Sequence, residues 1–344
     1  MHRWIRQAAG FLLLAAFCAL CDCRNATDVL SPPGHDAPPP PSESSISGAL
    51  KYLACAQNKD GSWGESGTNR PLLTALATLA YLSWREDATS ERYGATVKSG
   101  LNFALSEAEE TNGVSAWKQF EPDAKSATVW CLAEAYCLTV QPSVRDALLR
   151  VLKDWQPDGS CPFDLFATRA IRLSRIEPVA PYKQVAIAIL ARPATNQLVL
   201  ALQILAGYEA RQHSRTKALA SGLLDSCSND WPRGEFPIAT VLSISHALYN
   251  ADSPVSTAWD RQFSPRCCQN QFVCGTNRWW TSHSFGIESS TETARFSPRE
   301  ERIYTTALTI IAHPYPYRHL PLYYEQLENS AGTNDESSVR VTVR

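Results

Sequence analysis

The sequence lacks several features that would tie it directly to a function. It has no Asp-Asp pair, so it lacks the Asp-rich motif that holds Mg²⁺ where a diphosphate is ionised. It has no basic excess, because 32 Lys and Arg stand against 34 Asp and Glu. This balance excludes the basic footprint of a nucleic-acid-binding protein. With 344 residues, 44% of them hydrophobic, the chain can still bury a sizeable core.

No apolar run near the N-terminus is long enough for a comfortable membrane span, which needs about 20 residues. The run at 8–20 follows His2, Arg3 and Arg6, which is the pattern of an export signal, and we expect a signal peptide over 1–23. Leu20 and Cys23 resemble a bacterial lipoprotein box, although Asp22 stands where a small residue is expected. We therefore expect an exported protein of the periplasm or cell envelope, either secreted or held by a lipid anchor.

The next segment, 24–44, is predicted to be a proline-rich tether. It contains the stretch SPPGHDAPPPPSES, and such compositions favour an extended chain. At the other end, residues 326–344 are predicted to form a disordered polar tail. The segment between them, 45–325, is expected to hold the folded domain.

Cysteine is plentiful: the chain has 11, of which three lie in the signal region. In an exported protein we expect at least one disulfide, since the compartment is oxidising. Cys131 and Cys137 lie in an apolar helical stretch and are expected to be buried thiols. The disulfide candidates are Cys161, Cys227, Cys267, Cys268 and Cys274.

An internal repeat is present. Ser47-Gly48 recurs as Ser99-Gly100, an offset of 52 residues, and Gly61 recurs at the same offset as Gly113. A second echo places Gln156 and Gly159 where the first repeat has Gln57 and Gly61, with Cys161 where Trp63 would fall. Two further echoes run from Gln269-Asn270 through Gly275 to Trp279-Trp280, and from Leu223-Leu224 to Trp231. A period near 50 residues indicates a repeat architecture.

Helices of two kinds are predicted between these turns. The segment 143–155 has one apolar and one polar face, and Ser143 with Asp146 is typical of a capping box. Other segments are apolar on nearly all faces and are expected to be buried on all faces; they are 72–82, 127–138, 198–205, 238–248 and 304–312. Alternation of the two kinds predicts an all-α fold, a ring of about six helical hairpins.

The first repeat carries a family resemblance. Its pattern Gly48-x3-Tyr52-Leu53-x3-Gln57-x3-Gly61-Ser62-Trp63 resembles the QW repeat of squalene and oxidosqualene cyclases, a family that shares its α/α toroid with the protein prenyltransferases. The segment 305–322 also resembles the last inner helix and tail of exported bacterial proteins with such repeats. The resemblance implies an α/α toroid over most of 45–325.

The resemblance also implies a structural role for the repeat residues. In that family the glutamine side chain stacks on the tryptophan and hydrogen-bonds to backbone groups at a helix end. Such bonds are needed because a helix end leaves several backbone groups unpaired. An amide can both donate and accept, and glycine frees the turn. We expect this structural role for Gln57, Gly61, Trp63, Gln156 and Gly159. Trp279 and Trp280 are expected to close the ring where the last hairpin meets the first.

The catalytic motifs of these families are absent. Neither Asp-x-Asp-Asp nor Asp-Cys-Thr-Ala-Glu occurs. Asp225 and Cys227 match the local spacing of two zinc ligands in prenyltransferases, and His246 follows them. The histidine ligand of that family lies much farther along the chain. We therefore expect no metal and no cofactor. Glu134, alone in an apolar helix, is either hydrogen-bonded structurally or suited to acid–base chemistry.

The function expected from these features is binding. We expect a non-catalytic toroid whose central cavity binds an apolar ligand, a peptide or a partner protein. The alternative is a divergent enzyme, either cyclase-like or prenyltransferase-like, or a polysaccharide lyase or hydrolase, since toroids also host those activities.

Overall fold

The structure is a computed structural model, and residues 42–313 are described in it with short gaps. The predicted signal peptide, the tether as far as residue 41 and the polar tail lie outside the described residues, as do Gly113, Trp231 and the segment that follows His313. The described ranges are 42–65, 67–111, 114–176, 180–210, 212–230, 236–250, 253–287 and 293–313.

The described part of the chain is mainly helical, which confirms the predicted all-α class. The tether was predicted to run to residue 44, but its last three residues already belong to the first described helix. The twelve α-helices in these ranges are α2 (Ser42–Ala56), α3 (Asn69–Ser83), α4 (Gly94–Glu107), α5 (Pro122–Thr139), α6 (Pro142–Leu152), α7 (Pro162–Ser174), α8 (Ala180–Leu190), α9 (Gln197–Glu209), α10 (His213–Asp230), α11 (Ile238–Tyr249), α12 (Ser253–Gln269) and α13 (Pro298–Ala312).

Four short strands form two antiparallel ribbons within the same ranges. In the first, β1 (Glu110–Thr111) pairs with β2 (Val114–Ser115). In the second, β3 (Phe272–Cys274) pairs with β4 (Asn277–Trp279). Two 3₁₀ turns precede buried helices, η2 (Ala116–Gln119) before α5 and η4 (Ser282–Phe285) before α13.

Local chemistry explains where the helices begin. Ser297 caps α13, and Glu300 completes a capping box, with Pro298 at the first helical position. Asn196 caps α9 through its side chain. The capping box predicted at Ser143 is wrong: α6 begins one residue earlier, at Pro142, and its cap position is Gln141, whose side chain makes no capping bond.

The odd-numbered and even-numbered helices differ in burial. Thirteen consecutive residues of α3, from Pro71 to Ser83, are buried, and α11 is buried from Ile238 to Leu248. In contrast, α6 buries only one face, formed by Val144, Ala147, Leu148 and Val151. The predicted alternation of fully buried and half-exposed helices is therefore present where both kinds are described.

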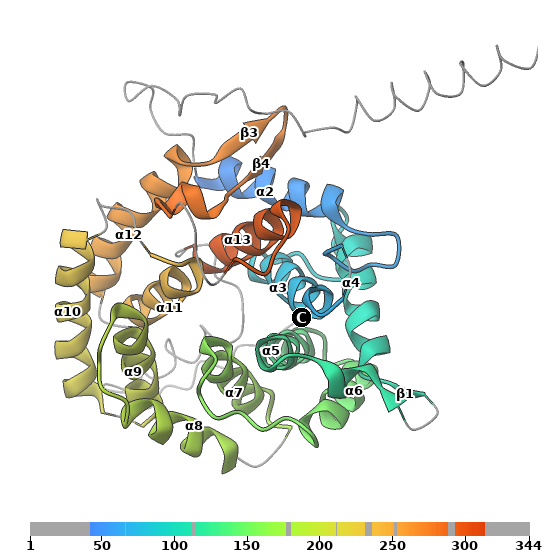
Figure 1. The fold of residues 1–344 in the computed structure, drawn as a ribbon, viewed down its shortest axis with the longest axis horizontal. Helices are drawn as coiled ribbons and strands as arrows, with labels where there is room; N and C mark the ends of the chain where they lie inside the picture. Colours follow the sequence, from blue (N-terminus) through green and yellow to red (C-terminus); the bar gives the residue numbers. More distant parts are fainter. Residues whose placement is uncertain are drawn as a thin grey trace, which may run out of the picture. The chain divides into compact units, whose positions relative to one another are not determined.

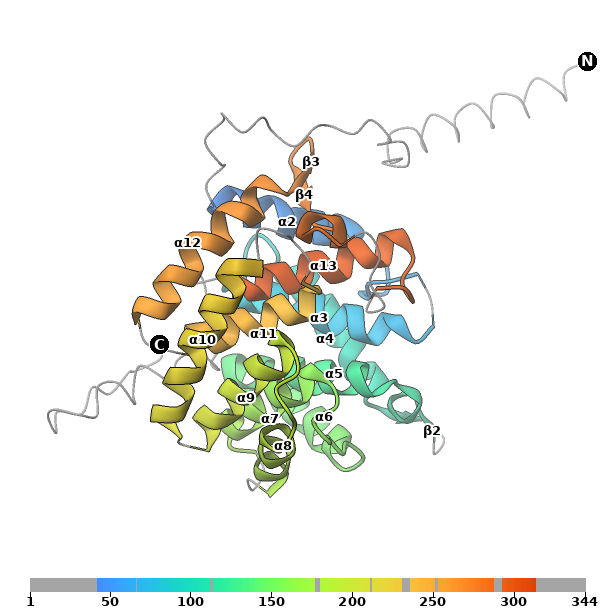
Figure 2. The same ribbon diagram turned by 60° about the vertical axis from the view of Figure 1, so that its left-hand side comes forward.

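The contacts between helices follow a regular order (Figure 1). Helix α3 packs against α5, α5 against α7, α7 against α9, α9 against α11 and α11 against α13. The order then returns to its start, because α13 packs against α3. Among the half-exposed helices, α12 contacts α2, and the ribbon strand β4 lies along α2, as Figures 1 and 2 both show. The first and last described hairpins are therefore neighbours.

Candidate functional site

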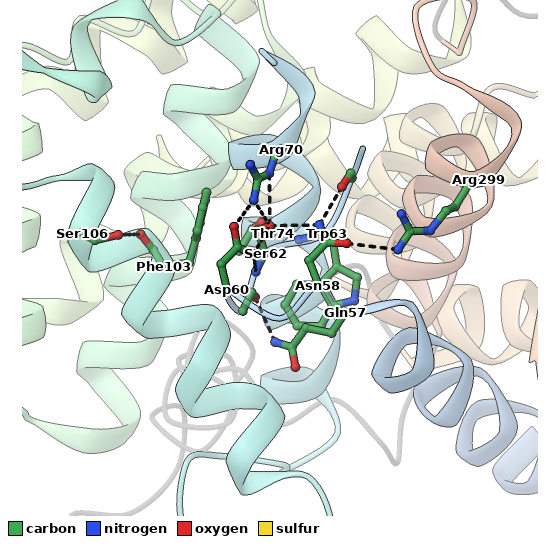
Figure 3. Close-up of polar contacts among 12 residues, drawn as sticks. Gln57, Asn58, Asp60, Ser62, Trp63, Arg70, Thr74, Phe103, Ser106 and Arg299 are labelled. Carbon is green, nitrogen blue, oxygen red and sulfur yellow. Dashed lines mark hydrogen bonds and ion pairs between the residues drawn. The ribbon is translucent and has the colours of Figure 1, made fainter. Parts of the chain in front are cut away.

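Gln57, at the end of the first turn after α2, joins two repeats. Its side-chain amide donates one hydrogen bond to the carbonyl oxygen of Gly61 and another to that of Thr96, both at 2.9 Å. Thr96 lies in the first turn of α4. Gln57, which lies in the turn drawn in Figure 3, therefore ties its own turn to the next half-exposed helix.

Trp63 is fully buried and makes two hydrogen bonds. Its indole Nε1 donates to the carbonyl oxygen of Leu53 in α2 at 2.7 Å, and its backbone N–H donates to Thr74 Oγ1 in α3 at 3.0 Å. The ring packs against Gly100 of α4, where a Cβ atom would lie 2.9 Å from the indole carbon Cζ3. Trp63 thus contacts three helices, and Gly100 is small so that it can do so.

Gly61 has a left-handed backbone, with φ of 87°. Glycine adopts this conformation without a steric penalty. A Cβ atom at this position would also clash with the Ser99 carbonyl in α4. Both constraints require glycine at position 61.

A similar arrangement recurs at the last repeat, and we call each such turn, with its glycine and the buried indole beside it, a joint. Trp280, also fully buried, donates from Nε1 to the Cys267 carbonyl in α12 at 2.8 Å and from its backbone N–H to Thr306 Oγ1 in α13 at 3.1 Å. Gln271 donates to the carbonyl of Ser45 in α2 at 3.0 Å. The last repeat is therefore joined to the first through Gln271.

Sequence reasoning missed Gln271 and placed the echo at Gln269 and Asn270. In the first repeat the glutamine precedes the tryptophan by six positions, whereas nine positions separate Gln271 from Trp280. The β3–β4 ribbon fills the difference. In both repeats the glutamine lies four residues after the residue whose carbonyl accepts the indole bond, Leu53 in the first and Cys267 in the last. This spacing between glutamine and helix end is what the two repeats share.

At the second predicted joint only the glycine keeps its role. Gly159 has φ of 78° and donates its backbone N–H to Asp164 Oδ2 at 2.9 Å. Gln156 is exposed, and no hydrogen bond of its side chain is found in the described structure, so the predicted role of Gln156 is not observed. Cys161, in the tryptophan position, instead caps α7 by accepting from the Phe163 N–H.

A buried carboxyl group organises this second joint. Asp164 accepts a hydrogen bond from the Ser126 hydroxyl in α5, and Ser126 Oγ also accepts from Trp155 Nε1 at 3.1 Å. Burial raises the pKa of Asp164, although the bonds from Ser126 and Gly159 oppose that rise. The indole that fills this joint therefore comes from Trp155, at the end of the preceding half-exposed helix.

The Asp-Gly-Ser tripeptide occurs at both turns. Asp60 accepts from the backbone N–H of Ser62 at 3.1 Å and from its hydroxyl at 2.7 Å, and the hydroxyl bond is the main reason that the pKa of Asp60 is lowered. Hydrogen bonds from the side chain and backbone of Ser160 lower the pKa of Asp158 in the same way. Arg70, which pairs with Asp60, also donates to Ser62 and lies over the Phe103 ring (Figure 3).

The start of α13 holds the first turn in place. Arg299 donates to the Ala56 carbonyl at 2.7 Å and to Asn58 Oδ1 at 3.2 Å. Glu300 accepts from the backbone N–H of Glu65 at 3.1 Å. In the loop before α13, Arg295 pairs with Asp123 at the start of α5. These charged residues are therefore engaged in joining elements that are far apart in sequence.

A second polar region, partly buried, lies near the ends of α7, α9 and α11. Arg169 Nε lies 2.6 Å from Glu209 Oε1, and Arg172 Nη2 lies 3.0 Å from Glu209 Oε2. Arg169 Nη2 also donates to Asn250 Oδ1 at 3.1 Å. One turn earlier, the His246 ring contacts that of Phe166, with centroids 4.6 Å apart. The region links three buried helices through charge and hydrogen bonds.

Glu134 lies fully buried in α5. Its Oε1 accepts a hydrogen bond from Trp130 Nε1 at 3.3 Å. This partner is an indole from the preceding turn of the same helix. Burial, with Glu134 as a smaller cause, raises the pKa of Cys137 to about 12.

The predicted disulfide is not formed. No two cysteines in the described part of the chain lie within disulfide distance of each other. The five candidates lie apart on the fold, since Cys161 starts α7, Cys227 lies in α10, and the adjacent Cys267 and Cys268 end α12 before Cys274 in β3. Burial raises the pKa of Cys161, Cys267 and Cys268.

The proposed zinc ligands do not form a cluster. Among the described residues there is no group of three or more His, Cys, Asp or Glu side chains that could hold a metal ion. His246 packs instead against the rings of Phe166 and Trp130.

Comparisons with protein-family models, with curated proteins and with solved structures gave no match. A search of the described helices for one long and apolar enough to cross a membrane found none.

Proposed function

We propose that the protein is an exported α/α toroid that works by binding rather than by catalysis. In this proposal the odd-numbered helices form an inner ring and the even-numbered helices an outer ring. The succession of helix contacts from α3 to α13 and back to α3 supports this arrangement. So does the difference in burial between the two sets of helices.

The observation that carries the binding proposal is the use made of the repeat residues. The glutamine and tryptophan side chains that resemble squalene cyclase repeats donate to backbone atoms of neighbouring helices. The resemblance is thus to the part of that family that builds the ring. The acidic motifs that protonate an alkene or ionise a diphosphate are absent from the sequence.

The ligand class proposed is an apolar molecule, a peptide or a partner protein, bound by a chain that is secreted or lipid-anchored at the cell envelope. Native mass spectrometry of the purified full chain tests this proposal. We expect a copurifying organic ligand that is released by denaturation and that raises the melting temperature when it is added back. One zinc per chain that is lost in both Cys227→Ser and His246→Ala would instead indicate a prenyltransferase-like metal enzyme.

An enzyme is the second candidate, and Glu134 favours it. Glu134 is a fully buried carboxyl group beside an indole, and buried carboxyl groups are common among catalytic acids and bases. The matched variant Glu134→Gln keeps the size of the side chain and removes its titration. If the protein is an enzyme of this kind, Glu134→Gln abolishes turnover of a substrate that it still binds. If it is a binding protein, the variant leaves ligand retention unchanged.

A further inference from the structure

The last joint contains an insertion that the first joint does without. Gln57 and Trp63 make their backbone bonds with a short turn between them, and Gln271 and Trp280 make the equivalent bonds with the β3–β4 ribbon between them. The ribbon is therefore not needed to form the joint. A segment that the fold does not require is a candidate for a separate role.

The ribbon exposes an apolar surface. Phe272 and Val273 of β3 are 44% and 43% exposed, which makes them two of the large hydrophobic side chains on the described surface. Phe272 stacks on Trp279 of β4, with ring centroids 6.2 Å apart and planes 9° from parallel. Trp279 in turn packs on Tyr52 of α2 at 5.5 Å. We call Tyr52, Phe272, Val273 and Trp279 the aromatic ribbon surface.

Trp279, which is 8% exposed, also differs in its hydrogen bonding from the tryptophans that form the joints. The indoles of Trp63, Trp155 and Trp280 donate to protein acceptors. For Trp279 no such bond is found within the described residues. Its indole Nε1 is also not fully buried, in contrast to the buried polar atoms that lack a partner. The surface thus combines stacked rings with an indole donor that is not sealed from solvent.

This combination suits one kind of ligand. A polyproline II segment has no internal hydrogen bonds, so its carbonyl groups remain available to donors. Such segments dock on aromatic surfaces and lose little entropy because they are already extended. The chain itself contains a sequence of this composition, SPPGHDAPPPP, at residues 31–41.

The length of that segment is sufficient for the contact. Eleven residues in polyproline II conformation span about 34 Å at about 3.1 Å per residue. The segment ends where α2 begins, at Ser42. Tyr52 lies ten positions farther along α2, about 15 Å at 1.5 Å per residue.

We propose that the aromatic ribbon surface binds the proline-rich segment 31–41 of a second copy of this chain. The exposure of Phe272 and Val273 leaves the surface open to another molecule. Each copy carries both the surface and the segment, so two copies can exchange segments about a twofold axis. The proposal does not depend on whether the proposed toroid binds a ligand at its centre.

Two measurements on the full chain test the proposal. The first is the fluorescence anisotropy of a labelled synthetic peptide of residues 31–41. The second is sedimentation velocity over a hundredfold range of chain concentration. We expect saturable peptide binding and reversible dimer formation. Phe272→Ser should weaken both at least about tenfold, and serine at the four positions 38–41 should abolish dimer formation.

The matched control is Ile187→Ser, which removes another exposed apolar side chain, in α8, and should change neither measurement. Circular dichroism checks that each variant is folded. Peptide binding that Phe272→Ser leaves intact would overturn the proposed surface. A chain that binds the peptide but stays monomeric at every concentration would overturn the second copy as its source. Dimer formation that survives serine at 38–41 would overturn the segment.

Discussion

The first and last joints of the chain are built alike, whereas the joint before α7 is built differently. Trp63 and Trp280 each bond a carbonyl of the preceding half-exposed helix and a threonine hydroxyl of the following buried helix. Before α7, Cys161 holds the tryptophan position, and Trp155 supplies the indole from the other side of the turn.

The difference shows which features a joint needs. All three turns place a glycine at positive φ, Gly61, Gly159 and Gly275, and all three joints bury an indole. The source of the indole and the atom that accepts its hydrogen bond can vary. A glutamine bond to another repeat is found at the first joint, where it reaches α4, and at the last joint, where it reaches α2.

The largest expected effect comes from removing an indole. Trp63→Ala and Trp280→Ala should each lower the free energy of unfolding by about 3–5 kcal/mol, because each leaves a large cavity between three elements. The measurement is urea denaturation followed by circular dichroism. Ile187→Ala, at an exposed position, is the control and should stay within about 0.5 kcal/mol of wild type.

Equal losses in the two variants would support equivalent joints. If Trp280→Ala melted like wild type, the last joint would not contribute to stability, and the first and last repeats would be coupled only through other contacts.

The next effect separates the two glycines. Gly61→Ala should cost about 2–4 kcal/mol, since the left-handed backbone and the clash with the Ser99 carbonyl both oppose a Cβ atom. Gly159→Ala should cost less, because its Cβ would meet the Ile189 side chain at 3.2 Å and the Val185 carbonyl oxygen at 3.6 Å, and neither contact is as close as that of Gly61 with Ser99. Thermal melting of both variants gives the comparison, and a Gly159→Ala variant that is the less stable of the two would contradict it.

Much of this fold could be predicted from hydrophobic pattern alone. The stretches at 72–82, 127–138, 198–205, 238–248 and 304–312 all lie inside buried helices of the structure. Helix α7 was missed because its sequence, PFDLFATRAIRLS, carries Asp164 and two arginines within an otherwise apolar run. Asp164 and Arg169 are buried in the structure, and the three charges are paired with groups from α5, α9 and the end of α11, which no local pattern reveals.

The sites were predicted less well than the helices. Gln57, Gly61 and Trp63 follow from local spacing, because a helix end and a tight turn need these residue types in order. Gln156 stands three residues before its glycine, whereas Gln57 stands four before Gly61, and Gln156 makes no equivalent bond in the described structure. The disulfide prediction was wrong because the number of cysteines carries no information on the distances between them. The candidates lie at four places, the start of α7, α10, the end of α12 and β3.

A smaller effect distinguishes the glutamines. Gln57→Ala and Gln271→Ala should each cost about 1–2 kcal/mol, because helix and turn carbonyls lose a donor in a partly or fully buried setting. Gln156→Ala is the matched control, and its exposed side chain should make it neutral within about 0.5 kcal/mol. Chemical denaturation of the three variants tests this order. A costly Gln156→Ala would show that the second joint also depends on its glutamine.

The smallest effect is a difference in titration between the joints. Burial raises the pKa of Asp164, whereas hydrogen bonds from serine lower the pKa of Asp60 and Asp158. A raised carboxyl pKa favours the folded state at low pH, and that contribution is lost as pH rises from about 3.8 through the folded pKa of Asp164. A lowered pKa acts in the opposite sense: the contribution of Asp60 and Asp158 is present above about 3.8 and is lost as pH falls through their folded pKa values. Carboxyl resonances followed by NMR should therefore titrate above 3.8 for Asp164 and below it for the other two, and a midpoint for Asp164 below that of Asp60 would show that its hydrogen bonds outweigh its burial.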